Sequence, residues 1–409
     1  MPNKPKRVLV IGLRKNVLEQ AKALDLYVIL IHKKERLKEH HRWLADEAYP
    51  LDIEDEKTLL SFVETIHQTT PVEVVLSFAD EALVSAARCH ERLGLKGNSV
   101  QTVEILKDKG KMRTRLRQIG FPSVRFRVGG TQEDFFSFLR SPFHPFIVKP
   151  TDGAGSDQVY QVRDETERNV VWSQLVRNGR SEFLMEEYLD GPEISVEAFS
   201  FHGNHHILAI TDKVIFPNFV ERGHAMPSTL SPRMKKEVVR TVTSFLDGVD
   251  FIDGPSHTEL KITSKGLRIL ESHNRIGGDK INELYKIAYG ENMLAMLFAW
   301  ETSRMTPWKT PPPPVGGAAI RFLSPPPGIV QEIRGVEKVK KDPNVCLVEI
   351  KVEEGEEVPR LKHSFDRIGC VVAKGKDTDE AVQKAEEMVR SIQILTAEPS
   401  QTSKESNPG

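Results

Sequence analysis

The chain has 409 residues, which is long for one hydrophobic core, so about two to four packed units are expected. Its 57 basic and 58 acidic residues nearly balance, which excludes a global field attracting nucleic acid or an anionic membrane. Hydrophobic residues at 39% and charged residues at 28% are typical of a soluble globular protein and exclude a membrane-embedded one. Cys89, Cys346 and Cys370 have neither zinc-site nor disulfide spacing, so a cytoplasmic location is expected.

Short apolar segments alternate with helix-compatible segments at the start of the chain. Residues 7–13 (RVLVIGL), 26–32 (LYVILIH) and 72–78 (VEVVLSF) are rich in Val, Ile and Leu, as buried parallel strands are. Residues 1–105 are therefore predicted to form an N-terminal α/β domain with helices over a parallel sheet. Gly12 suits a tight turn, but no second glycine follows it closely, which argues against a dinucleotide fingerprint and a nicotinamide cofactor.

The middle of the chain has an α+β pattern. A helix is predicted over 103–119, followed by a small unit in which a glycine-rich turn at 151–156 separates two strands. The expected strands are 145–149, 158–162, 182–187, 193–202, 206–215, 255–262 and 267–272, and the expected helices are 132–140, 165–177, 232–247 and two within 279–302.

A proline run marks a boundary near the C-terminal part. The segment TPPPPVGG (310–317) favours extended geometry and excludes helix, so it is predicted to be a linker. Beyond it, 317–375 is strand-rich, 378–395 is an amphipathic helix, and the polar tail 397–409 is predicted to be disordered. The expected folded units are an N-terminal domain 1–105, a lid with its linker helix 106–188, a central unit 189–309 and a C-terminal α+β domain 310–396.

The segment FIVKPTDGAGSDQVY (146–160) is the first candidate for chemistry. Lys149 ends a strand, and the loop after it contains Gly153, Gly155 and Ser156. Glycine lets backbone N–H groups close over phosphate oxygens, and the lysine ammonium supplies positive charge. Because Asp-Gly also favours an ordinary hairpin turn, phosphate binding and a plain turn are both open here.

The segment FLMEEYLDGPEISVEAF (183–199) is the second candidate. An apolar strand leads through two acids and a short turn into another strand. A chain crossing between domains can offer backbone groups to adenine, while carboxylates accept from the exocyclic amine and the ribose hydroxyls. Glu186 and Glu193 are the candidates, and a solvated strand edge is the alternative.

The segment GPSHTELKITSKGLRILESHNRIGGD (254–279) is the strongest candidate. Alternation places Glu259 and Glu271 on paired strands, so the two carboxylates can converge to hold Mg²⁺ at nucleotide phosphates. Arg275 follows, with a guanidinium suited to the same phosphate or to a developing oxyanion. A solvated hairpin or a simple ion pair is the alternative, but the apolar surroundings favour a site.

Taken in order, these motifs resemble those of the ATP-grasp superfamily, and several segments are similar to the bacterial L-amino-acid ligases, the dipeptide synthetases. The resemblance covers about residues 5–395 and implies an ATP-grasp fold with an N-terminal Rossmann-like, pre-ATP-grasp domain. It rests on Asp108-Lys109, VKP with its glycine loop, MEEYLDGPE (185–193), ELK to ILESHNR (259–275), NFVERGHAMPSTL (218–230), NRIGGD (274–279), GIVQEIRGV (328–336) and DRIGCVVAKGKDTDEAV (366–382).

The resemblance also implies roles for residues at the nucleotide. Lys109 and Lys149 match lysines that hold phosphates, and Gly153 to Ser156 match the flap over them. The adenine and ribose contacts implied are Glu186 for the amine, Leu189 for the ring through its backbone, and Glu193 for the ribose.

Metal and catalytic roles follow from the same resemblance. Glu259 and Glu271 match the metal carboxylates, and Arg275 matches the arginine that steadies the acyl phosphate, so Arg275 and Lys149 are the expected catalytic residues. Many members carry Asn two positions after the second metal glutamate. Here His273 holds that position and Asn274 follows, so metal coordination by either residue stays open.

The implied reaction is ATP-dependent dipeptide formation. A carboxylate attacks the γ-phosphate of ATP, and an amine then displaces phosphate from the aminoacyl phosphate. The implied cofactors are ATP and Mg²⁺, with Mn²⁺ as an alternative, and the implied partners are amino acids and a second copy of the chain, without nucleic acid or membrane. Expected substrate contacts are Glu221, at an ammonium group, His224, His257, Gly277 and Gly278.

Two other functions stay open. Another ATP-grasp carboxylate–amine ligase would differ in substrate only. A nucleotide-binding module without catalysis is the second alternative, and the intact lysines, glutamates and arginine of the motifs argue against it.

Overall fold

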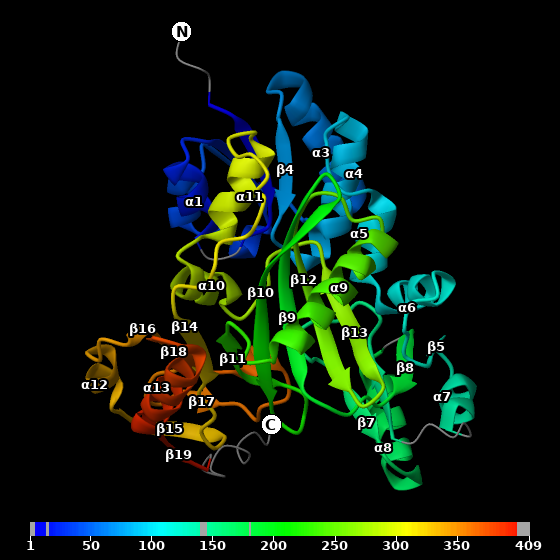
Figure 1. Cartoon of the computed structure of the whole chain (residues 1–409), viewed down its shortest axis with the longest axis vertical. Helices are drawn as coiled ribbons and strands as arrows, with labels where there is room; N and C mark the ends of the chain where they lie inside the picture. The colour runs from blue at the N-terminus through cyan, green and yellow to red at the C-terminus, as the bar shows by residue number, and fades with distance from the viewer. Residues whose placement is uncertain (1–4, 14–15, 140–144, 180, 399–409) are drawn as a thin grey trace, which may run out of the picture.

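The structure is a computed structural model that describes residues 5–13, 16–139, 145–179 and 181–398. It confirms the mixed α/β and α+β class with a parallel N-terminal sheet (Figure 1). Most of the tail predicted to be disordered, residues 399–409, lies outside this part. Among the described residues, no helix is long and apolar enough to cross a bilayer.

The N-terminal sheet has the strand order β3-β2-β1-β4, and all its pairs are parallel. Strands β1, β2 and β4 are buried on both faces, which explains their unbroken apolar sequences. Leu9 and Ile29 face α3 and α4, whereas Val8 and Val28 share a core with α1 and α11. The elements are β1 (Arg7–Ile11), α1 (Val17–Ala23), β2 (Tyr27–His32), η1 (Lys34–Arg36), α2 (Glu39–Leu44), β3 (Glu47–Pro50), α3 (Glu56–Thr69), β4 (Val74–Ser77), η2 (Asp80–Ala82) and α4 (Leu83–Leu93).

The predicted helix over 103–119 is in fact two helices, α5 (Val100–Lys107) and α6 (Lys109–Gln118). Asp108 separates them because its backbone is extended (φ −103°, ψ 111°) and its side chain accepts from the Lys111 N–H at 2.7 Å. Such an N-cap satisfies a free donor of the new helix. The break makes Lys109 the first residue of α6.

A small antiparallel sheet, in the order β5-β8-β6-β7, forms the second unit. Phe135, Phe146 and Phe183 pack with Trp172 between this sheet and its two helices. The sheet therefore has its own core. Its elements are β5 (Phe126–Gly129), α7 (Gln132–Leu139), β6 (Phe146–Lys149), β7 (Tyr160–Val162), α8 (Glu165–Arg177) and β8 (Phe183–Glu187).

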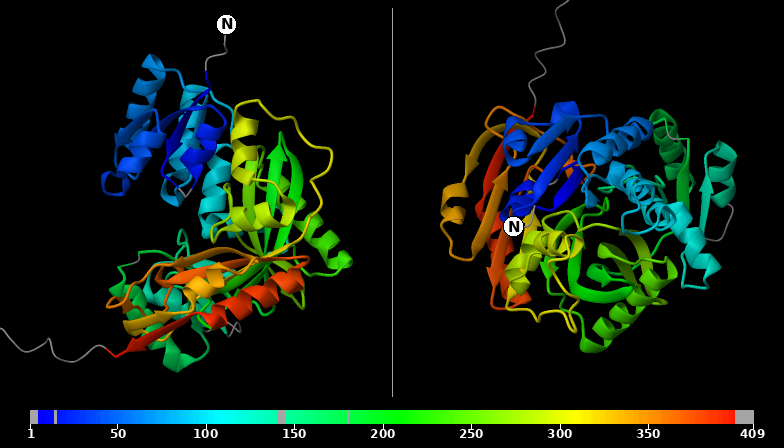
Figure 2. Two further views of the ribbon diagram at one scale, coloured as in Figure 1. Left: turned by 90° about the vertical axis from the view of Figure 1, so that its left-hand side faces the viewer. Right: turned by 90° about the horizontal axis from the view of Figure 1, so that it is seen from above.

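An eight-stranded antiparallel sheet, in the order β13-β12-β9-β10-β11-β14-β18-β16, forms the centre of the molecule. It continues across the proline-rich segment, because β11 pairs with β14. The N-terminal sheet lies at one end of the long axis, and the C-terminal strands and the small sheet lie at the other (Figures 1 and 2). The elements up to the proline-rich segment are β9 (Glu193–Phe201), β10 (Asn204–Ile215), β11 (Glu221–Met226), α9 (Pro232–Gly248), β12 (Gly254–Thr263), β13 (Gly266–His273), α10 (Ile281–Tyr289) and α11 (Met293–Glu301).

The predicted helix over 378–395 ends earlier than expected. Helix α13 stops at Ser391, and β19 (Gln393–Ala397) then pairs with β15 in a three-stranded sheet. The apolar residues of β19 also fit a helical period, but their pairing with β15 makes them a strand. The remaining elements are β14 (Gly317–Phe322), β15 (Gly328–Arg334), α12 (Val336–Lys340), β16 (Val345–Ile350), β17 (Glu357–Val358), η3 (Ser364–Asp366), β18 (Gly369–Gly375) and α13 (Thr378–Ser391).

Candidate active site

A cavity between the small sheet and the central sheet gathers four lysines, and we call it the lysine cavity. Lys109 comes from the start of α6, Lys149 from the end of β6, Lys213 from β10 and Lys261 from β12. The sequence-predicted residues that line it are Lys109, Lys149, Gly153, Gly155, Ser156, Glu186, Leu189, Glu193, Glu221, Glu259 and Glu271. The three candidate motifs therefore meet in one place.

The two predicted metal carboxylates face each other across a strand pair. Glu259 on β12 and Glu271 on β13 are register partners. The Lys213 ammonium lies 2.7 Å from Glu259, and the Lys109 ammonium lies 2.9 Å from Glu271. Burial acts to raise the pKa of Glu271, but Lys109 and His273 together lower the pKa to about 2. Burial likewise opposes the shift at Glu259, whose pKa Lys213 holds well below its usual range.

A buried charge triad supports Lys149. Glu186, 3% exposed, contacts the Lys149 ammonium with one oxygen and accepts from Arg113 Nε with the other at 3.0 Å. Burial would raise the pKa of Glu186, but Arg113 and then Lys149 lower it to about 2, and burial lowers the pKa of Lys149. Arg113 also donates to the Leu270 carbonyl at 3.0 Å. The Glu186 carboxylate thus contacts two cations and also lines the lysine cavity, so its predicted contact with an adenine amine stays a prediction.

Lys213 and Arg113 were not among the predicted site residues. Lys213 is register partner of Glu193, and its ammonium lies 3.7 Å from Glu193 and 3.8 Å from Glu221. Burial acts to lower the pKa of Lys213, and the surrounding glutamates raise it instead. Arg113 could have been suspected from the sequence, because it follows Lys109 by four residues and both therefore lie on one helix face. Lys213 gives no local signal, since its partners are known only from strand register.

The glycine loop folds over the lysine cavity. The Lys109 ammonium donates to the Gly153 carbonyl at 2.6 Å, and Ser156 Oγ donates to the Phe219 carbonyl at 2.9 Å. Gly155 has φ +68°, a conformation that favours glycine. The loop is therefore placed as a flap, and we use this name for Gly153 to Ser156.

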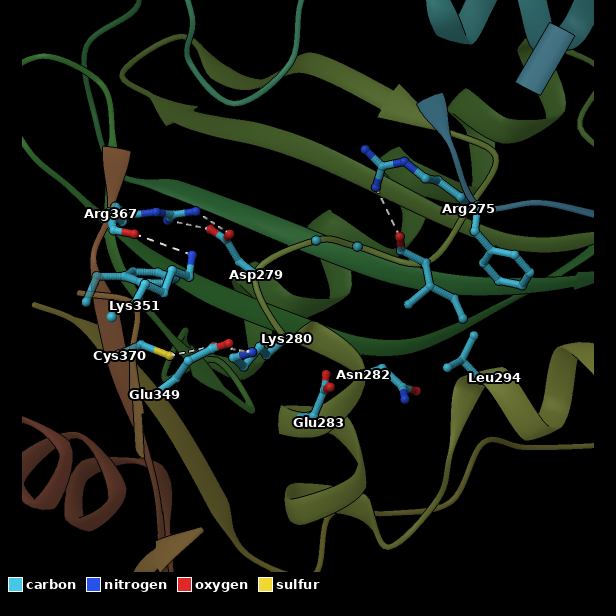
Figure 3. A pocket seen from close by; sticks show the side chains of 16 residues that line it. Arg275, Asp279, Lys280, Asn282, Glu283, Leu294, Glu349, Lys351, Arg367 and Cys370 are labelled. Atoms are coloured by element: carbon cyan, nitrogen blue, oxygen red, sulfur yellow. Dashed lines mark hydrogen bonds and ion pairs between the residues drawn. The ribbon is translucent and has the colours of Figure 1, made fainter. Parts of the chain in front are cut away.

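A second cavity, about 320 Å³ in volume, lies beside the first, and we call it the arginine cavity (Figure 3). Arg275, Gly277 and Gly278 line it, so the structure places these predicted residues apart from the lining of the lysine cavity. The Arg275 guanidinium contacts Asp80 after β4, with Nη2 3.1 Å from Oδ2, and donates from Nη1 to the Ile276 carbonyl at 3.0 Å. Arg275 thereby joins the N-terminal sheet to the centre.

The opposite wall of the arginine cavity is a second ionic cluster. Arg367 Nη1 donates to Asp279 Oδ2 at 2.8 Å, and His224 Nε2 lies 3.0 Å from the same oxygen. Arg367 Nη1 is also 3.6 Å from Glu221 Oε2. Because Glu221 lines the lysine cavity and Arg367 lines the arginine cavity, the two cavities share this wall.

The remaining predicted histidines are buried beside charged groups. His257 Nδ1 is 2.7 Å from Glu197 and its Nε2 is 3.3 Å from Glu259, so it supports a predicted metal carboxylate. Burial opposes its charged form, but Glu197 and Glu259 raise the pKa of His257 to about 9. Burial and Arg275 lower the pKa of His273 to about 3, and Asn274 lines a third cavity.

Glu259 and Glu271 supply two carboxylate ligands for a hard cation, and the remaining ligands would have to come from elsewhere. In the described part of the chain, no group of three or more His, Cys, Asp or Glu side chains is arranged to hold a metal ion. Two ionised carboxylates remain, and Mg²⁺ commonly takes one or two carboxylates and completes its shell with phosphate oxygens and water. The pair therefore fits a metal that arrives with a nucleotide.

Three family models match parts of this chain. The ATP-grasp N-terminal domain family matches residues 18–97, the ATP-grasp domain family matches 143–283, and L-amino acid ligase C-terminal domain 2 matches 321–397.

Two curated relatives and one solved structure share these parts. Alanine–anticapsin ligase of Bacillus subtilis is 27% identical over 309 residues, covering 68% of this chain and 65% of the relative, so the chain spans just under two thirds of that protein's length. The L-arginine-specific L-amino acid ligase of Bacillus subtilis is 22% identical over 79% of this chain and 80% of its own length. The crystal structure of an L-amino acid ligase from Bacillus licheniformis superposes with a TM-score of 0.84 at 23% identity, covering 97% of this chain and all of that one. The chain thus contains ATP-grasp domains, followed over residues 321–397 by a domain that matches the C-terminal domain 2 of L-amino acid ligases.

Proposed function

We propose that this chain is an ATP-dependent L-amino-acid ligase, which forms a dipeptide through an aminoacyl phosphate and releases ADP and phosphate. The observation that carries the proposal is the pair of cavities with a shared wall. One holds the lysines and paired glutamates suited to a nucleotide, and the other holds Arg275 and room for small polar ligands. An aminoacyl group at that wall would meet both the phosphate and the second amino acid.

The lysine cavity is proposed to hold ATP. Lys109 and Lys149 would contact the phosphates under the flap, Leu189 would meet adenine through its backbone, and Glu193 would accept from the ribose. Glu186 is proposed to accept from the adenine amine and, through its contact with the Lys149 ammonium, to position Lys149 as well. Lys213 would add a charge beside the transferred phosphate.

Glu259 and Glu271 are proposed to hold Mg²⁺, with Mn²⁺, which accepts the same oxygen ligands, as the alternative. The metal, when bound, would neutralise charge on the transferring phosphoryl group. His257 is proposed to position Glu259, since it is 7% exposed and lies between Glu197 and Glu259.

The arginine cavity is proposed to hold the amino acids. The Arg275 guanidinium would stabilise the acyl phosphate and the tetrahedral intermediate. Gly277, which packs against His257, and Gly278 would lie beside the substrate. Glu221 and the Asp279–His224 pair lie where an ammonium group would need a carboxylate. A flap closed over both reactants would exclude water, which otherwise hydrolyses the acyl phosphate.

The units 1–105, 106–188, 189–309 and 310–396 are proposed as the working parts of this ligase. Support comes from the family matches at 18–97 and 321–397, which fall largely within the first and the last of them. A homodimer is proposed from the family resemblance alone, and a cytoplasmic location is proposed from the three widely spaced cysteines.

A screen of paired L-amino acids with ATP and Mg²⁺ tests the function. We expect phosphate release that requires both a carboxylate and an amine, with a dipeptide identified by mass. A Glu271→Gln variant is the negative control. Phosphate release that needs an amine other than an amino acid would support the other ATP-grasp ligases, and no turnover with any pair would support a non-catalytic module.

A further inference from the structure

A short segment of the C-terminal part touches both cavities at once. We call Ser364 to Arg367, which comprises η3 and the residue after it, the latch segment. The Ser364 N–H donates to the Gly155 carbonyl of the flap at 2.9 Å, and Ser364 Oγ donates to Glu221 Oε2 at 2.5 Å. One residue of the C-terminal domain therefore holds the flap and the wall of the lysine cavity together.

The aromatic residue of the latch segment lies on the flap. A Cβ atom placed on Gly155 would lie 3.0 Å from Phe365 Cε2, so the ring packs directly on the glycine backbone. Phe365 is 74% exposed, which means that it contributes little to the hydrophobic core. The contact that Phe365 makes with Gly155 of the flap is therefore the notable interaction of this exposed ring.

Arg367 connects the latch segment to the arginine cavity. Its Nε donates to the Ser364 carbonyl at 2.8 Å, and its Nη1 donates to Asp279 at 2.8 Å (Figure 3). The guanidinium also stacks on Phe322, with Cζ 3.7 Å from the ring centroid, and the residue is 8% exposed. Arg367 thus holds Ser364 through the hydrogen bond to its carbonyl, and the ion pair with Asp279 holds Arg367 itself in place.

We propose that Arg367 is a positioning residue through which amino acids in the arginine cavity favour closure of the flap over ATP in the lysine cavity. The proposal rests on the function proposed above. An amino acid that contacts the Arg367–Asp279 pair would hold the latch segment in place, and the latch segment would hold Gly155. ATP would then be sequestered chiefly when an amino acid is present, which limits wasteful hydrolysis.

The contacts between the latch segment and the flap give an expected size for the coupling between amino-acid binding and nucleotide binding. One hydrogen bond and one ring contact link the latch segment to the flap, so their loss should change the closed-to-open ratio by about 3- to 10-fold. Because coupling between two ligands is reciprocal, amino acids should tighten nucleotide binding by the same factor as the nucleotide tightens amino-acid binding.

The test compares Phe365→Ala and Arg367→Lys with the full-length wild type. Binding of a non-hydrolysable ATP analogue with Mg²⁺ is measured by calorimetry, with and without a mixture of the proteinogenic L-amino acids. In the wild type the mixture should tighten binding about 3- to 10-fold. This gain should disappear in Arg367→Lys and should be clearly smaller in Phe365→Ala, which loses the ring contact but keeps the Ser364–Gly155 hydrogen bond. The phosphate released per dipeptide formed should rise by a similar factor. Trp43→Ala, which removes another exposed aromatic ring that lines neither cavity, is the matched control and should behave as wild type.

Because Arg367 is buried, Phe365→Ala decides the matter if Arg367→Lys does not fold. The proposal is overturned if amino acids tighten nucleotide binding equally in the wild type and in Phe365→Ala, or if they do not tighten it in the wild type. A wild type that binds both ligands with coupling but forms no dipeptide would instead refute the proposed function and leave the latch supported.

Discussion

Replacing Arg113 with methionine should weaken both the fold and ATP binding. Arg113 is fully buried, and its guanidinium joins three elements of the nucleotide site. It lies on α6, four residues after Lys109, and it bonds to Glu186 on β8 and to the Leu270 carbonyl on β13, beside Glu271. Methionine keeps much of the volume and removes all of these donors.

The magnitude follows from the bonds that are lost. A hydrogen bond to a charged partner is worth about 1.5–3 kcal/mol, and a buried carbonyl left without a donor costs about 1–3 kcal/mol. Because such terms are not additive, we expect a loss of about 3–5 kcal/mol in the free energy of unfolding. Glu186 would then neutralise Lys149 alone, so less positive charge would face the phosphates and the KM for ATP should rise about 10-fold or more.

Urea unfolding and ligation kinetics measure the two effects, and a neighbouring arginine provides the control. Arg115 on the same helix pairs with Asp250 at 3.0 Å, but the Asp250 side chain is 76% exposed. Arg115→Met should therefore cost less than about 1 kcal/mol and leave the KM for ATP unchanged. Equal stabilities of Arg113→Met and Arg115→Met would refute the reasoning.

Three further predictions concern charge. Arg275→Ala should retain ATP binding in calorimetry and lose ligation, since Arg275 lies in the arginine cavity; full ligation would contradict its role. His257, whose folded pKa of about 9 exceeds its usual 6.5, should contribute about 3 kcal/mol of stability below pH 6.5, and this should be lost as the pH rises through 9. Urea midpoints should show that fall in the wild type but not in His257→Gln. Removing Mg²⁺ with EDTA should weaken ADP binding at least 10-fold, and unchanged affinity would exclude a metal at the paired glutamates.

The sequence predicted the elements whose signals are local. The strands of the N-terminal sheet were identifiable because burial on both faces demands continuous Val, Ile and Leu. Strand β3 was missed because EAYP has only four residues and contains Glu and Pro, which are depleted in strands, and its pairing with β2 gives it its conformation. The break at Asp108 and strand β19 were missed because helix-compatible residues surround both, and an N-cap and a partner strand override that preference.

The same distinction applies to the candidate site. Glu259 and Glu271 were predicted to converge because a short turn joins their strands and fixes the register. Arg113 and Lys213 were missed because their partners, Glu186 and Glu259, are far away in the sequence. For Arg113, the helical spacing from Lys109 indicates a shared helix face but not the contact with Glu186, and Lys213 has no signal within its own segment.

The charge of the lysine cavity argues against a simple anion site. Its lining contains the four lysines Lys109, Lys149, Lys213 and Lys261, but also seven acids, Asp157, Glu186, Glu187, Glu193, Glu221, Glu259 and Glu271. With all of these charged, the lining sums to −3, and the buried Arg113 behind it brings the sum to −2. A free nucleotide polyphosphate would meet net repulsion there, whereas a nucleotide that brings divalent cations would not. The excess of carboxylates therefore favours a site that selects the metal complex of ATP over ATP itself.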